Sequence, residues 1–78
     1  MESYMDRIVV NQDIMVGKPV IKGTRIPVDA ILQRIADGFS IEDILEEYPN
    51  ITKEDVKAAI MYSTQIVKSE NIIPVIQN

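Results

Sequence analysis

Apolar residues recur at helical spacing in three successive segments of the chain. In each segment the side chains at positions i, i+3, i+4 and i+7 fall on one face of an α-helix, and almost all of them are apolar. The three sets are Val28, Ile31, Leu32 and Ile35, then Ile41, Ile44, Leu45 and Tyr48, and finally Val56, Ala59, Ile60 and Ser63, which Ile66 and Val67 follow. The pattern predicts three amphipathic helices.

Capping residues stand between these periodic runs and not inside them. A glycine after a helix is typical of its end, and a serine or threonine followed three residues later by an acid is typical of a helix start. The signals are Gly38 after the first run, Ser40 with Asp43 before the second, Pro49 and Asn50 after it, and Thr52 with Asp55 before the third. The second and third helices therefore match the layout of a helix-turn-helix, which offers the third helix to a DNA groove.

An extended arm precedes the first helix. The segment 17–28 is rich in β-branched residues, which favour strands, and Gly23 with Thr24 interrupts it as a turn would. A second apolar run upstream can pair with it in a β-hairpin or with a second copy of the chain. Because an isolated two-stranded hairpin is marginal in water, we expect a symmetric dimer. The residues assigned to its interface are Ile8, Val9, Val10, Val20 and Ile21.

These elements divide the 78-residue chain into an N-terminal arm of residues 1–27, a three-helix domain of residues 28–69 and a C-terminal tail of residues 70–78. The tail is apolar around Pro74, which disfavours helix there. Either the tail folds back onto the core of its own chain, or it orders on a partner as an extended apolar peptide. In the second case the contact residues are Ile72, Ile73, Val75 and Ile76.

The composition of the chain argues against catalytic and metal chemistry. Cysteine and histidine are both absent, so there is no disulfide, no thiolate nucleophile and no imidazole to activate a serine or to bind a transition metal. The acidic residues of the second helix lie on its exposed face, as a soluble helix requires. We expect no enzymatic activity, no cofactor and no metal. The absence of cysteine and of a long apolar stretch favours a cytoplasmic protein without membrane contact.

Positive charge gathers in the arm, although the net charge of the chain is −4. No acid interrupts the arm between Asp13 and Asp29. The arm is a candidate for phosphate contacts, and a solvated arm with a structural role is the alternative. The candidate DNA-binding residues are Lys18, Lys22, Thr24 and Arg25 in the arm and Lys53 and Lys57 at the start of the third helix.

The second helix carries the opposite charge. Glu42, Asp43, Glu46 and Glu47 lie on it, and it has no basic residue. These carboxylates repel phosphate and so oppose DNA contact by the helix-turn-helix. The same charge suits a basic protein partner.

The chain also resembles domain-of-unknown-function family 433. The similarity rests on the segment 17–26, Gly38, the Ser40 start with Asp43, Tyr48 with Pro49, and Thr52 with Asp55, Val56, Ala58 and Ala59. It implies a homeodomain-like three-helix fold and a VapB-like antitoxin whose partner is a PIN-like nuclease toxin.

Two functional classes therefore compete. In the first, the chain is an antitoxin that neutralises the nuclease and, as a homodimer, represses the shared operon through DNA. In the second, it is a stand-alone DNA-binding regulator or a structural dimerisation adaptor without a toxin. The charge of the second helix favours the first class.

Overall fold

The computed structural model describes residues 4–69 of the chain. Within this range the protein is mainly helical, with one short antiparallel strand pair, as the sequence predicts. The elements are two short 3-10 segments, η1 (Tyr4–Arg7) and η2 (Met15–Gly17), two strands, β1 (Ile8–Val10) and β2 (Pro19–Ile21), and three helices, α1 (Val28–Ala36), α2 (Ile41–Glu47) and α3 (Lys53–Ser69). The tail residues 70–78, including the four assigned to partner binding, lie outside the described residues.

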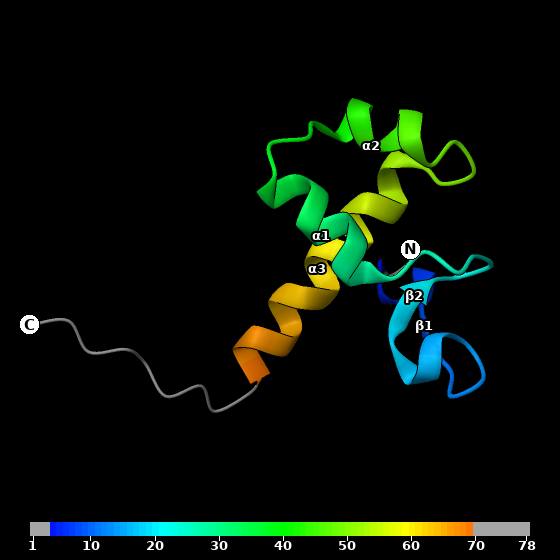
Figure 1. Cartoon of the computed structure of the whole chain (residues 1–78). Coiled ribbons are helices and arrows are strands. Elements are labelled where there is room, and N and C mark those ends of the chain that lie inside the picture. Colours follow the sequence, from blue (N-terminus) through cyan, green and yellow to red (C-terminus); the bar gives the residue numbers. More distant parts are fainter. Residues whose placement is uncertain (1–3, 70–78) are drawn as a thin grey trace, which may run out of the picture.

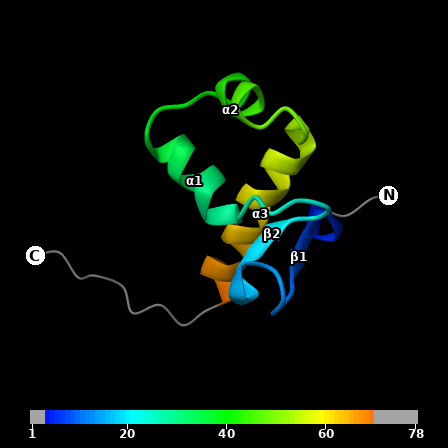
Figure 2. The ribbon, with the colours of Figure 1, turned by 45° about the vertical axis from the view of Figure 1, so that its right-hand side comes forward.

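The long helix α3 organises the molecule. Figures 1 and 2 show α1 and α2 near its first half and the β-hairpin on another side, while its last turns project beyond α1 and α2. The core gathers one or more residues from β2 and from each helix, because each predicted apolar stripe faces inward. Its buried members are Ile21, Val28, Ile31, Ile44, Ile51, Val56 and Ala59.

The third apolar stripe is only partly covered. Val56 and Ala59 are completely buried, whereas Ile60, Ile66 and Val67 are exposed. For Ile66 and Val67 the physical reason is length, since the last turns of α3 project past α1 and α2 (Figures 1 and 2). Helical periodicity predicted α3 correctly, but it did not show how much of the apolar face of this helix would be buried.

The two strands pair within the chain. Ile8 stands opposite Ile21, Val9 opposite Val20 and Val10 opposite Pro19. This is the hairpin alternative, and it removes the unpaired strands that motivated a dimer contact at these residues. The side chains of Val20 and Ile21 are only 1% exposed, so both are used in the packing of their own chain.

Both predicted capping boxes are confirmed. In α2 the Ser40 hydroxyl accepts a bond from the Asp43 amide at 3.1 Å, and the Asp43 carboxylate accepts one from the Ser40 amide at 3.0 Å. Thr52 and Asp55 repeat the arrangement at the start of α3, at 3.2 and 2.9 Å. Each box satisfies amide groups that a helix start would leave without partners.

Gly38 ends α1 as predicted. Its φ of +97° lies in the region that side chains other than glycine rarely adopt. The Gly38 amide donates to the Ile35 carbonyl at 3.0 Å, and the Phe39 amide donates to the Arg34 carbonyl at 2.9 Å. This pair of bonds is the Schellman motif, which reverses the chain. The reversal sets Phe39 between α1 and α2.

Candidate functional site

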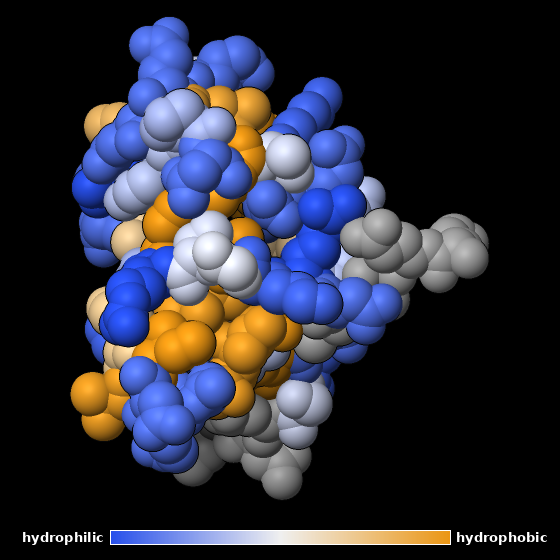
Figure 3. Space-filling view, turned by 90° about the vertical axis from the view of Figure 1, so that its right-hand side faces the viewer, coloured by the Kyte–Doolittle hydropathy of each residue, from blue (hydrophilic) through white to orange (hydrophobic). Residues whose placement is uncertain are grey.

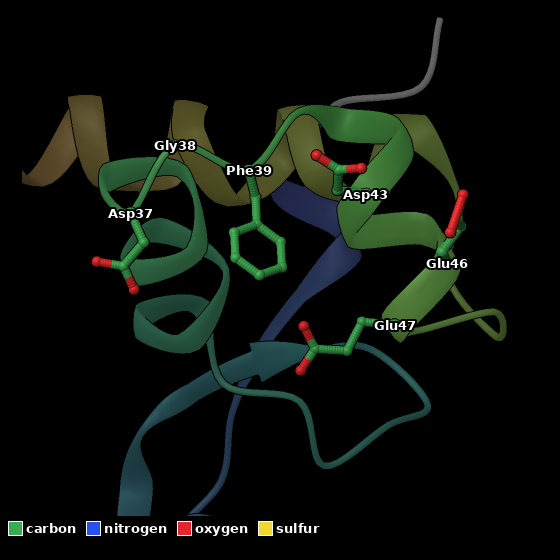
Figure 4. Close-up of a pocket in the computed structure, with 6 residues that line it drawn as sticks. All are labelled: Asp37, Gly38, Phe39, Asp43, Glu46 and Glu47. Carbon is green, nitrogen blue, oxygen red and sulfur yellow. The ribbon is translucent and has the colours of Figure 1, made fainter.

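A hollow of about 640 Å³ lies between the end of α1 and α2. Figure 4 shows the Phe39 ring within it, with side chains of α2 on one side and Asp37 on the other. We call this hollow the acidic groove, and its lining residues are Asp37, Gly38, Phe39, Asp43, Glu46 and Glu47. Its position follows from the glycine cap, because the reversal at Gly38 separates the two helix ends.

Arg34 joins the two helices that form the acidic groove. Its Nε and Nη2 atoms donate to the two carboxylate oxygens of Glu47 at 2.8 and 2.7 Å, a bidentate pair that fixes both position and direction. The guanidinium carbon also lies 5.8 Å from the centroid of the Phe39 ring, in cation–π range. The hydrogen bonds to Glu47 raise the pKa of Arg34, and those from Arg34 hold the pKa of Glu47 below its usual range.

The acidic groove keeps a negative charge after this pairing. Four carboxylates line it, and Arg34 compensates one of them, which leaves an excess of three. The backbone hydrogen bond from Ser40 holds the pKa of Asp43 below its usual range. Phe39 adds an aromatic surface that is 39% exposed. An acidic hollow with an aromatic ring is suited to a basic side chain of a partner.

The turn at Gly23 and Thr24 is held by hydrogen bonds between residues of the arm itself. The Thr24 hydroxyl donates to the Ile21 carbonyl at 2.8 Å and accepts from the Ile26 amide at 3.0 Å, while the Ile21 amide donates to the Ile26 carbonyl at 3.0 Å. Gly23 supplies the positive φ of 80° that the turn requires. The Thr24 side chain, assigned to DNA contact from the sequence, is thus already used in shaping the turn.

Lys18 and Lys22 of the arm lie in different surroundings. Lys18 forms an exposed ion pair with Asp29 at 3.0 Å, which partly neutralises it. Lys22 instead lines a hollow together with Asp55, close to the first turn of α3. The exposed Lys53 begins this turn, and the exposed Lys57 stands at the start of the next turn. Lys22 therefore lies near the start of α3, in a hollow that Asp6 and Arg7 also line, whereas Lys18 is paired with Asp29.

The sequence pattern did not predict an exposed apolar surface on the hairpin. The hairpin tip, defined as Val10, Met15 and Val16, is exposed to solvent. Met15, Val16 and Gly17 have successive positive φ angles of 51°, 55° and 78°. Only Gly17 signals such a backbone from the sequence, because β-branched valine normally avoids it.

Within residues 4–69, no group of three or more histidine, cysteine, aspartate or glutamate side chains is arranged to hold a metal ion. None of the helices described is both long and apolar enough to cross a membrane.

Comparison with known proteins gives a family but no activity. The family described as "Protein of unknown function (DUF433)" matches residues 8–63, which confirms the resemblance seen in the sequence. An uncharacterized protein of Sinorhizobium fredii is 36% identical over 56 residues, which are 72% of this chain and 25% of that protein. An uncharacterized protein of Archaeoglobus fulgidus is 77% identical over 26 residues, 33% of this chain and 72% of that protein.

A solved structure shares the architecture. The crystal structure of a DUF433 member protein from Anabaena variabilis superposes with a TM-score of 0.75 and 31% sequence identity, and the match covers 80% of this chain and 61% of that one. The chain thus spans about a quarter of the length of the Sinorhizobium relative and 61% of the length of the Anabaena protein.

Proposed function

The chain belongs to the DUF433 family, and we propose that it is a cytoplasmic antitoxin that neutralises a PIN-like nuclease toxin. Its activity is binding and not catalysis. The absence of histidine and cysteine from the sequence supports this, because these residues supply the usual nucleophiles and bases. A homeodomain-like helix-turn-helix and repression of the shared operon form the second part of the proposal.

The observation that carries the antitoxin proposal is the acidic groove. A nuclease that cleaves RNA attracts phosphates with positive charge around its active site. An acidic surface with an exposed aromatic ring competes for the same positive charge and can hold a basic side chain over Phe39. The Arg34–Glu47 pair keeps α1 and α2 in place, so the groove does not have to be ordered when the partner binds.

The experiment is inhibition of the nuclease encoded beside this gene. The nuclease cleaves a labelled RNA while the concentration of this chain is varied. Glu46→Lys reverses one charge of the groove at an exposed carboxylate, and we expect the concentration for half inhibition to rise about tenfold. Glu54→Lys, at an exposed site on α3 outside the groove, is the matched control and is expected to inhibit like the unchanged chain.

Two results would contradict the antitoxin proposal. The first is a wild-type chain that leaves RNA cleavage unaffected at every concentration. The second is the absence of a PIN-like nuclease gene beside this one. Either result would favour the alternative of a stand-alone DNA-binding regulator or a dimerisation adaptor. Equal weakening by Glu46→Lys and Glu54→Lys would instead assign inhibition to net charge and not to the groove.

One observation favours DNA binding as a second function. Lys22 lies near Asp55 of α3, and Lys53 and Lys57 are exposed on the first two turns of that helix, so three cations are available on neighbouring elements. Phosphate contacts from a turn and a helix start would set the helix against the DNA backbone. The carboxylates of α2 oppose this arrangement, which is why the arm and not the helix-turn-helix is expected to supply most of the affinity.

A further inference from the structure

We propose that two copies of this chain associate through their hairpins, with Val16 of each copy seated in an apolar groove of the other and Asp13 of each copy beside Arg25 of the other. This surface is separate from the acidic groove. It shares Val9, Val10 and Val20 with the residues assigned to a dimer from the sequence, but the contact is between side chains and not a pairing of strands. It therefore goes beyond the proposed function and stands independently of it.

Val16 combines an exposed apolar side chain with a backbone conformation that is unfavourable for valine. Its side chain is 87% exposed, and its backbone has φ of 55° and ψ of 44°, in the left-handed region. A β-branched residue in this region costs about 1–2 kcal/mol. The neighbouring Met15 and Val10 are also exposed apolar side chains. Val16, which we call the knob, is therefore an apolar side chain held in solvent on a strained backbone. No contact within residues 4–69 compensates for this strain.

An apolar groove of about 520 Å³ lies on the same hairpin. Val20, only 1% exposed, belongs to the packing at this site, although it is not part of the main core cluster. The lining residues are Val9, Ile14, Val20, Gly23, Thr24 and Arg25. Figure 3, viewed from the hairpin side, shows a continuous hydrophobic area bordered by hydrophilic side chains. The groove can accept a small branched side chain such as valine.

The charges beside the knob and the groove are complementary. Arg25 lines the groove, and Asp13 precedes Val16 by three residues in the same loop. Within residues 4–69 neither side chain has an ion pair or a side-chain hydrogen bond, whereas Lys18 nearby in sequence is already paired with Asp29. A knob seated in the groove of a second copy brings Asp13 to the side where Arg25 lies.

The knob and the groove on one hairpin define the symmetry of the pair. When a two-fold axis relates the two copies, Val16 of each copy enters the groove of the other. This is an isologous contact, and it is complete with two copies. Two small hairpin surfaces bury less area than a standard stable interface of about 800 Å² per partner. The dimer is therefore expected to be weak and to depend on protein concentration.

Sedimentation velocity of the full chain over a range from about 1 to 300 µM tests the proposal, because small interfaces dissociate within such a range. The sedimentation coefficient should rise from monomer to dimer with concentration. Val16→Asn should weaken the association at least tenfold while raising the thermal midpoint, because asparagine tolerates the left-handed backbone. Val67→Asn changes an equally apolar, exposed residue on α3 and should leave the association unchanged.

A charge exchange tests the pairing of Asp13 with Arg25. Asp13→Arg and Arg25→Asp should each weaken association at least roughly tenfold, because each acts at two symmetry-related contacts. The double variant should return to within about threefold of the unchanged chain, since the opposite charges are restored. A chain that stays monomeric throughout, a Val16→Asn variant that associates normally, or a double variant that remains weak would overturn the proposal.

Discussion

At the scale of single residues, Asp55 connects two distant parts of the chain. Its Oδ2 atom accepts a bond from the Thr52 amide at 2.9 Å, and its Oδ1 atom accepts one from Arg7 Nη1 at 3.1 Å. The side chain is only 14% exposed, so water competes weakly for either bond. One carboxylate thus caps α3 and holds the N-terminal segment η1 against it.

We expect Asp55→Ala to lower the free energy of unfolding by about 2 kcal/mol, because it removes a helix cap and leaves Arg7 without this partner. Asp43→Ala is the matched control, since Asp43 has the same position in the capping box of α2 but no ion pair with η1. It should cost clearly less. Urea unfolding followed by circular dichroism measures both, and equal losses would contradict a role for the Arg7 contact.

Local residue pairs were predictable from the sequence, and distant pairs were not. Ser40 with Asp43 signalled a cap because their partners are three residues apart. Arg34 and Glu47 are 13 residues apart and Arg7 and Asp55 are 48 apart, and no local pattern specifies such contacts. The left-handed Val16 was likewise unpredictable, because its residue type disfavours the conformation that the loop imposes.

At the scale of elements, the helices followed from periodicity, whereas the arrangement of the arm depended on the folded chain. The apolar stripes predicted α1, α2 and α3, since each stripe must be buried. The extended segments were equally consistent with a hairpin or with pairing between two copies, because both satisfy the same backbone groups. Only the folded chain shows Lys22 near the start of α3 and Lys18 paired with Asp29.

This difference between the two lysines gives a test of DNA binding. For the DNA upstream of the gene, Lys22→Ala should weaken binding and flatten the slope of log affinity against log salt by about one unit, the effect of one lost phosphate contact. Lys18→Ala is the matched control and should change the slope less, because Asp29 already compensates its charge. Fluorescence anisotropy at several salt concentrations measures both.

Lys22 is the cleaner position for this test because Arg25 also belongs to the proposed dimer contact. Arg25→Ala should flatten the slope as Lys22→Ala does, and Lys53 and Lys57 should assist from α3. An unchanged slope for Lys22→Ala would remove the arm from the DNA interface. DNA contact would then depend on Lys53 and Lys57 of α3, which the carboxylates of α2 oppose.

At the scale of the whole molecule, opposite charges occupy different regions. The acidic groove lies between α1 and α2, and the hairpin with its turn lies on another side of α3 (Figure 1). The proposed nuclease contact is therefore separate from the hairpin, whereas the proposed DNA and dimer contacts share Arg25. Among residues 4–69, the buried members of the core cluster lie between Ile21 and Ala59, before the last turns of α3. This placement determines what removal of the C-terminal tail is expected to do.

Deletion of residues 71–78 should leave the three-helix fold intact and abolish co-purification with the neighbouring nuclease. The expectation rests on the four apolar tail residues, which form a peptide able to dock in a groove of the nuclease. Circular dichroism and a pull-down measure the two effects separately. If the shortened chain unfolds, the tail belongs to the core of its own chain. If it folds and still inhibits the nuclease, while Glu46→Lys in the same shortened chain does not, the contact lies in the acidic groove alone.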